Sequence, residues 1–186
     1  MERTTHLLTP ASLKALAHPI RVQLLGLLRT DGPSTATALA ERVGESSGTT
    51  SYHLRQLAAA DFVVEDTGRG NGRERWWRAA QDSTRLEAAA LDDDPATLAA
   101  AEAYLGAVSR SHVRALETWI AEGRSWPRRW YQASTMDDFS LSLSPAELTR
   151  LVAAVEELVE AFRREPRKGD ERVRVHFSAF PVRSGG

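Results

Sequence analysis

The sequence has no cysteine among its 186 residues, so disulfide bonds and thiolate metal sites are excluded. No hydrophobic run approaches the length that spans a membrane, and the first dozen residues lack the apolar core of a signal peptide. Lysine is nearly absent as well, because only Lys14 and Lys168 accompany the many arginines. We therefore expect a soluble, cytoplasmic protein with no membrane partner.

An excess of positive charge is also missing, because the formal net charge is -1. The proportions of 42% hydrophobic and 26% charged residues are ordinary for globular proteins. The net charge of the whole chain thus gives no support to a nucleic-acid partner. The positions of the charged residues along the chain are more informative about such a partner than the net charge. Residues 82–102 are acidic, and we expect this stretch to face away from DNA.

Two closely spaced helices are predicted between residues 34 and 59. For the first helix, Ser34 is a candidate N-cap, and Leu39, Ala40 and Val43 recur at helical spacing. Gly44 closes this helix, since glycine tolerates a positive φ. Such a pair of helices with a short turn is typical of a helix-turn-helix.

The second helix has an apolar face and a polar face. Ser46 or Ser47 can cap it, and Thr50, Leu54 and Leu57 recur at i, i+4 and i+7, so they point toward the first helix. Polar side chains of this length suit base edges and phosphates in a major groove. The candidate DNA-binding residues of this helix are Ser46, Ser47, Thr49, Thr50, Ser51, Tyr52, His53, Arg55 and Gln56.

A basic β-hairpin is predicted next. Residues 62–66 and 73–79 read as strands, and the glycine-rich segment 68–72 reads as the turn between them. Arg69, Arg73 and Arg75 place positive charge on this hairpin, as binding to a phosphate backbone requires. The alternative is a solvated hairpin whose arginines bind nothing. We expect Trp77 to pack in the core.

These motifs together resemble the winged helix-turn-helix domain of ArsR-type transcriptional regulators, over Leu13 to Ala79. The matching features are the apolar segment Leu16 to Leu28, then Leu39-Ala40-Glu41-Arg42, Ser51-Tyr52-His53-Leu54, and Gly72-Arg73 followed by Trp76-Trp77-Arg78. Asp61 departs from the pattern, because the family usually has glycine there. The resemblance implies a DNA-binding regulator, and the absence of cysteine excludes the thiol-based arsenic, cadmium or lead sensing of its relatives.

A long helix is predicted over about residues 95–122, and the sequence Asp92-Asp93-Asp94-Pro95 suits its start. Residues on one face of this helix recur in steps of three and four, and we call this face the seam. Such a face favours a dimer contact, and packing within the monomer is the alternative. The candidate dimer residues are Leu98, Ala101, Leu105, Val108, His112 and Trp119. His112 has no second histidine three or four residues away, so we expect no metal site.

A small β-α-β module is predicted over about residues 137–180. Phe139, Leu141 and Leu143 alternate with polar residues, and so do Val173, Val175 and Phe177. Ser144-Pro145-Ala146-Glu147 reads as a capping box that starts the helix between them. Because two strands alone are marginal, we expect them to gain partners from the dimer or from the long helix.

Aromatic and basic residues gather near the end of the long helix. The candidate effector residues are Trp119, Trp126, Arg128, Arg129 and Trp130. They could bind a small organic effector that is acidic or aromatic, or they could simply fill the junction between the long helix and the β-α-β module. The second interpretation is the more ordinary one.

The sequence does not favour an enzyme. Residues 44–48 match G-x-S-x-G, but a helix precedes them where a nucleophile elbow needs a strand. We expect an α+β, mainly helical fold, with a winged helix-turn-helix domain over 1–80 and a dimerisation and effector region over 81–186. The predicted function is a homodimeric repressor that binds a palindromic double-stranded operator without a cofactor. A winged helix that binds another protein, and a regulator controlled by an organic effector, are the alternatives.

Overall fold

A computed structural model describes residues 5–69, 74–86, 91 and 94–183 of the chain. The chain divides into two compact units, Met1–Ile120 and Ala121–Gly186. The division thus falls near the end of the long helix, whereas the sequence prediction placed a boundary after residue 80. The predicted class, α+β and mainly helical, is confirmed.

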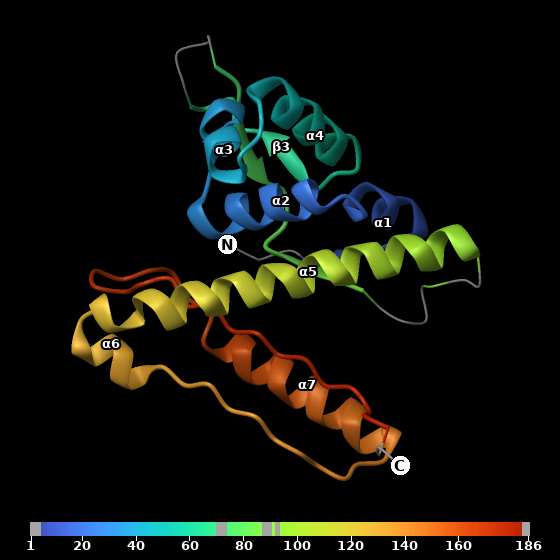
Figure 1. The fold of residues 1–186 in the computed structure, drawn as a ribbon, viewed down its shortest axis with the longest axis vertical. Coiled ribbons are helices and arrows are strands. Elements are labelled where there is room, and N and C mark those ends of the chain that lie inside the picture. The colour runs from blue at the N-terminus through green and yellow to red at the C-terminus, as the bar shows by residue number, and fades with distance from the viewer. Residues whose placement is uncertain (1–4, 70–73, 87–90, 92–93, 184–186) are drawn as a thin grey trace. The chain divides into compact units, whose positions relative to one another are not determined.

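In the first unit two helices follow a short strand (Figure 1), α1 (Pro10–Leu16) and α2 (Pro19–Asp31). Thr9 starts α1 through a capping box with Ser12. His18 is the N-cap of α2, because its Nδ1 accepts a hydrogen bond from the backbone nitrogen of Ile20 at 3.3 Å. Both helices have proline in the first turn, where its missing N–H costs nothing.

The helix-turn-helix consists of α3 (Ala36–Val43) and α4 (Ser47–Ala59). Gly44 adopts a left-handed φ of 72° between them, as the sequence predicts. The N-cap of α3 is Thr35, not Ser34, because the Thr35 side chain accepts from Ala38 N while Ser34 pairs with Trp77 in a sheet. Ser46 caps α4, which decides between the two predicted serines.

A three-stranded antiparallel sheet carries the wing, in the order β2 (Ser34–Thr35), β4 (Trp76–Ala79), β3 (Val63–Glu65). Val63 pairs with Ala79, and Glu65 pairs with Trp77. The two predicted wing strands are therefore confirmed, while residues 70–73 of the predicted turn lie outside the described residues. Asp61 precedes β3 with a φ of 60°, a conformation that aspartate adopts more readily than most residues.

A second sheet was not predicted. β1 (Thr5–Leu7) pairs in parallel with β5 (Ser83–Arg85), and the hydroxyls of Thr5 and Ser83 lie 2.8 Å apart. Each strand has only three residues with little apolar character, so periodicity gave no signal.

The core of the first unit lies between the helices and the wing sheet. Its fully buried side chains include Phe62, Leu16, Leu24, Leu54 and Leu57. Trp77 is 5% exposed, which confirms its predicted place in the core. The long helix α5 (Pro95–Glu122) matches its predicted range and adds Ala100 and Ala101 to this core. The side chain of Asp94 starts α5 by accepting from the backbone nitrogen of Thr97 at 3.0 Å.

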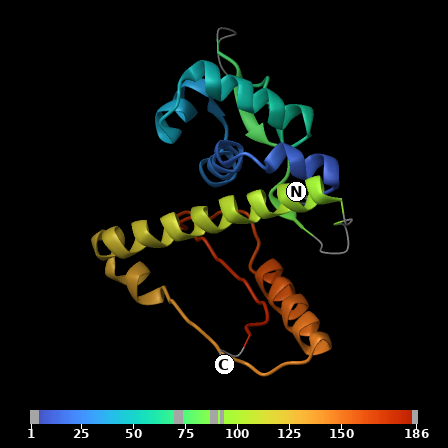
Figure 2. The same cartoon turned by 45° about the vertical axis from the view of Figure 1, so that its right-hand side comes forward.

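The second unit contains a short 3-10 helix η2 (Gly123–Ser125), α6 (Arg128–Ala133) and α7 (Pro145–Ala161). The capping box of Ser144 and Glu147 at the start of α7 is confirmed. The two flanking strands of the predicted β-α-β module are wrong for the single chain, because residues 134–144 and 163–183 contain no strand. The physical reason is that strands need a paired ladder, and two alone are marginally stable. Figure 2 draws both segments as extended chain before and after α7.

Across the described ranges, no helix combines the length and apolar character needed to cross a membrane.

Candidate nucleic-acid interface

Helix α4 is held in one orientation by its buried face. Thr50, Leu54 and Leu57 are each 0% exposed, which confirms the predicted inward face. The exposed face of the helix presents Tyr52 and Arg55, and the tyrosine is 53% exposed. Ser47 is also exposed, and Thr49, Ser51 and Gln56 are half-buried. Polar side chains on this face are thus available to base edges and phosphates.

Two candidate DNA-binding residues require correction. Thr50 and His53 are buried, with exposures of 0% and 6%, and neither side chain faces solvent. His53 lies three residues after Thr50 and four before Leu57, so helical geometry places it on the inner face. Its ring packs against that of His18, with centroids 4.4 Å apart and planes 41° apart.

The environment of His53 favours the neutral imidazole. Burial is the largest cause that lowers the pKa of His53, and the nearby His18 and Arg21 lower it further, against a smaller opposite effect of Glu45. His53 Nδ1 has no hydrogen-bond partner among the described residues. Protonating this ring therefore places a charge in the interior beside another imidazole and a guanidinium.

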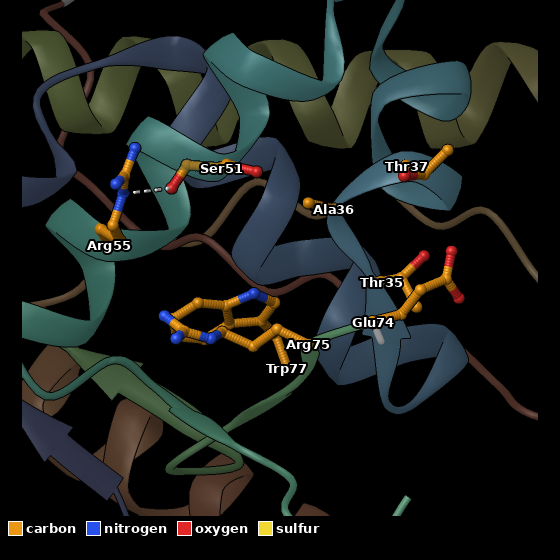
Figure 3. A pocket seen from close by; sticks show the side chains of 8 residues that line it. All are labelled: Thr35, Ala36, Thr37, Ser51, Arg55, Glu74, Arg75 and Trp77. Atoms are coloured by element: carbon orange, nitrogen blue, oxygen red, sulfur yellow. Dashed lines mark hydrogen bonds between the residues drawn. The ribbon is translucent and has the colours of Figure 1, made fainter. Parts of the chain in front are cut away.

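A hollow of about 350 Å³ lies beside the exposed face of α4 (Figure 3). It brings together the start of α3, helix α4 and the wing. The residues that line it are Thr35, Ala36, Thr37, Ser51, Arg55, Glu74, Arg75 and Trp77. A polar hollow between a helix amino terminus and two guanidinium groups suits an anion such as a DNA phosphate.

The two arginines of the hollow are held loosely. Arg75 Nε lies 3.1 Å from a carboxylate oxygen of Glu65, and its guanidinium carbon lies 5.8 Å from the Trp77 ring. Arg55 Nε donates to the backbone carbonyl of Ser51 at 3.2 Å (Figure 3). A guanidinium has five N–H donors, so each side chain keeps donors for a phosphate. The Glu74 carboxylate opposes an anion in the same hollow.

Sequence reasoning missed Thr35 and Thr37 as members of this surface. Thr35 is the N-cap of α3, and its hydroxyl oxygen accepts from Ala38 N at 3.2 Å. The signal was available, because threonine directly before a helical pattern is a common cap and a helix start favours anions.

Of the other two predicted wing arginines, the structure describes Arg69 but not Arg73. Arg69 is exposed and forms an ion pair with Asp66 at 3.1 Å. Arg73 lies outside the described residues. An exposed ion pair of this kind stabilises the fold little, so Arg69 can exchange its partner for a phosphate at small cost.

A partly buried polar joint supports the base of the wing. Arg29 Nε donates to the Gln81 carbonyl at 2.9 Å, and Gln81 Nε2 donates to the Asp61 carbonyl at 3.0 Å. Burial lowers the pKa of Arg29 to about 10 despite the opposing effects of Tyr104 and Asp82. The joint connects α2, the segment that follows β4 and the turn that follows α4.

The predicted dimer seam of α5 is divided between two environments. Ala101 is 4% exposed and packs in the core of the first unit, so it is not available to a partner. Leu98 and Leu105 are 41% and 50% exposed, and Leu116 and Ile120 continue the exposed apolar positions. The remaining seam residues, Val108, His112 and Trp119, are half-buried. Packing within the monomer thus accounts for only part of the seam.

The candidate effector residues belong to different units. Trp119 lies in the first unit, and Trp126, Arg128, Arg129 and Trp130 lie in the second. Trp126 is 40% exposed, both arginines are exposed, and Trp130 is half-buried. In the described part of the chain, no three histidine, aspartate or glutamate side chains are grouped closely enough to hold a metal ion.

The helix pair and wing define a DNA-binding protein of the winged helix-turn-helix class. Residues 16–66 match a family model described as a helix-turn-helix domain, and this segment of the chain is such a domain. The match supports the predicted resemblance to ArsR-type regulators and a DNA-binding helix-turn-helix over residues 16–66. Members of this class are typically not enzymes.

Two solved structures are similar to parts of the chain. One is the homodimeric winged helix-turn-helix DNA-binding domain of Mb0332 from Mycobacterium bovis, described as a possible ArsR-family transcriptional regulator. It is 28% identical, covers 55% of this chain and 80% of its own, and has a TM-score of 0.34. The other is an apo double mutant of ZitR from Lactococcus lactis, at 16% identity, with coverages of 80% and 84% and a TM-score of 0.33. TM-scores this low do not establish a shared overall fold. No curated protein matches the chain.

Proposed function

We propose that this protein is a homodimeric repressor that binds a palindromic double-stranded operator in the cytoplasm. The observation that supports it most is the polar hollow in which Arg55 of α4 and Arg75 of the wing lie beside the start of α3. In this proposal Tyr52 contacts base edges, while Arg69, Arg75 and, across the hollow, Arg55 contact phosphates. Base contacts give sequence preference, and phosphate contacts give salt-dependent affinity.

The exposed apolar positions of α5 support the dimer. Leu98, Leu105, Leu116 and Ile120 are large apolar side chains that remain 40–64% exposed in the single chain. A two-fold dimer presents two recognition helices about 34 Å apart, which is one turn of DNA. Operator symmetry then mirrors protein symmetry. The polar face of α4 argues against the alternative of a protein-binding winged helix.

Control by a ligand, where it operates, uses an organic molecule or a protein and not a metal. The sequence has no cysteine, and no second histidine lies three or four residues from His112. Trp126 with Arg128 and Arg129 offers an apolar surface beside positive charge. An effector there regulates only by binding the DNA-competent and DNA-incompetent states with different affinity.

The decisive experiment selects bound fragments from random duplex DNA and measures the mass of the free and bound protein by light scattering. We expect enriched sites with dyad symmetry and two chains per site. Variant Leu105→Lys tests the dimer, and Ala103→Lys, at another exposed position of α5, is the matched control. Enriched sites without symmetry, or one chain per site, would contradict the homodimer. No enrichment at all would contradict sequence-specific binding.

A further inference from the structure

Two extended segments of the second unit expose large apolar side chains in alternation. The first segment, residues 137–143, exposes Phe139, Leu141 and Leu143 by 78%, 63% and 43%. The second segment, residues 171–177, exposes Val173, Val175 and Phe177 by 70%, 64% and 44%. A period of two is the pattern of a β-strand with one buried face. These side chains therefore lack the apolar cover that their pattern requires.

The two segments are complementary to each other. Each apolar residue of the first segment has an apolar counterpart 34 positions later, since Phe139 corresponds to Val173. In a parallel pairing at this offset, Leu141 lies opposite Val175, and Leu143 lies opposite Phe177. At the intervening positions Asp138 then faces Arg172 as an opposite-charge pair, and Ser140 lies opposite Arg174. Cross-strand pairs of these kinds stabilise sheets.

The turn after α7 fixes where the second segment starts. Arg164 forms an ion pair with Asp170 at 2.6 Å, and Asp170 Oδ2 also accepts from the backbone nitrogen of Arg167 at 2.7 Å. These contacts hold the pKa of Asp170 at about 2, so the carboxylate stays charged at neutral pH. Gly169 supplies the positive φ of 91° that the turn needs. Residue 171 thus begins an extended run at a defined point.

We propose that a second copy of this chain pairs with these segments, so that the first segment of each protomer joins the second segment of the other. One copy supplies only two strands, whereas three or more are needed for a stable sheet, and two copies supply four. The pairing covers six large apolar side chains of each chain, which removes their apolar surface from water.

This proposal rests on the homodimer of the proposed function and adds a contact outside α5. The pairing is reciprocal, as two-fold symmetry requires, because residue 140 of one chain meets residue 174 of the other and the converse also holds.

The absence of cysteine makes disulfide trapping a clean test. Variants Ser140→Cys and Arg174→Cys are purified separately as full-length chains, mixed and oxidised. Directly opposed strand residues lie about 5 Å apart, within reach of a disulfide. We expect a covalent dimer that contains one chain of each variant. The matched control mixes Ser140→Cys with Ser178→Cys, whose partner position lies about 13 Å further along the strand.

Three outcomes overturn the proposal. The first is equal cross-linking in the control, and the second is no cross-link in a chain that light scattering shows to be dimeric. The third is a disulfide within one chain when both substitutions are combined in the double variant Ser140→Cys/Arg174→Cys. The second outcome contradicts only the strand exchange and is compatible with a dimer formed through α5. A chain that is monomeric by light scattering instead contradicts the homodimer of the proposed function. Should either variant fold poorly by circular dichroism, the pair Ser142→Cys and His176→Cys tests the same register.

Discussion

Removal of the Glu65 carboxylate is expected to strengthen DNA binding without changing its sequence preference. Glu65 holds Arg75 at 3.1 Å, and the two side chains are 43% and 58% exposed. An ion pair this exposed stabilises the free protein by about 0.2–1 kcal/mol. Arg75 has to give up this partner when it binds a phosphate. Variant Glu65→Gln removes that cost, which corresponds to a gain in affinity of about 1.4- to 5-fold.

The companion variant Arg75→Ala is expected to weaken every sequence alike. One lost phosphate contact lowers the slope of log affinity against log salt by about 0.9. Fluorescence anisotropy titrations between about 50 and 200 mM salt measure both quantities. The double variant Glu65→Gln/Arg75→Ala should show a smaller gain from the glutamate change, because Arg75 is no longer there to be released.

Arg78 provides the matched control for this experiment. It is exposed on β4 but does not line the hollow. Arg78→Ala should therefore change the salt slope less than Arg75→Ala does. The reasoning is refuted if Arg75→Ala leaves the slope intact, or if Glu65→Gln alters which bases are preferred.

Three further predictions concern stability. Asp61→Gly should raise the free energy of unfolding by about 1 kcal/mol, because glycine adopts the φ of 60° without strain; denaturant unfolding measures this, and a loss of stability would contradict it. Leu54→Ala should cost about 2–5 kcal/mol, since this side chain is 0% exposed, and a cost below 1 kcal/mol in the same assay would argue against its central position. His53 has a lower pKa in the folded than in the unfolded chain, so the unfolded state binds more protons and stability falls as the pH drops below about 6.5. Unfolding at several pH values should show this loss in the parent and less of it in His53→Gln; equal slopes would exclude the imidazole as its source.

Local sequence patterns predicted the helix-turn-helix well because its determinants are local. Gly44 closes α3, Ser46 caps α4, and Thr50, Leu54 and Leu57 form the buried face. Each of these features depends on residues within one or two helical turns. The N-cap of α3 is Thr35 and not the predicted Ser34. Local patterns did not reveal this, because Ser34 pairs in a sheet with Trp77, which lies far away in the sequence.

The candidate site was predicted less completely than the fold. Arg55 and Arg75 were identified, and they meet in one hollow. His53 was assigned to DNA because a polar residue on a recognition helix suggests a contact, yet its partner His18 comes from the turn before α2. A neutral imidazole can pack in a core, so residue type alone did not distinguish the two roles.

The strands of the second unit show a different limit of sequence reasoning. Alternation at Phe139, Leu141, Val173 and Val175 is a property of one chain, whereas a β-ladder is a property of two neighbouring strands. The alternation therefore indicates which face of each segment is apolar, but it does not indicate which strand or molecule packs against that face. The exposure of these four side chains in the single chain, between 63% and 78%, is what an intermolecular partner would remove. In the proposed strand exchange these side chains are covered only in the assembly, and alternation along one chain does not specify which strand pairs with it.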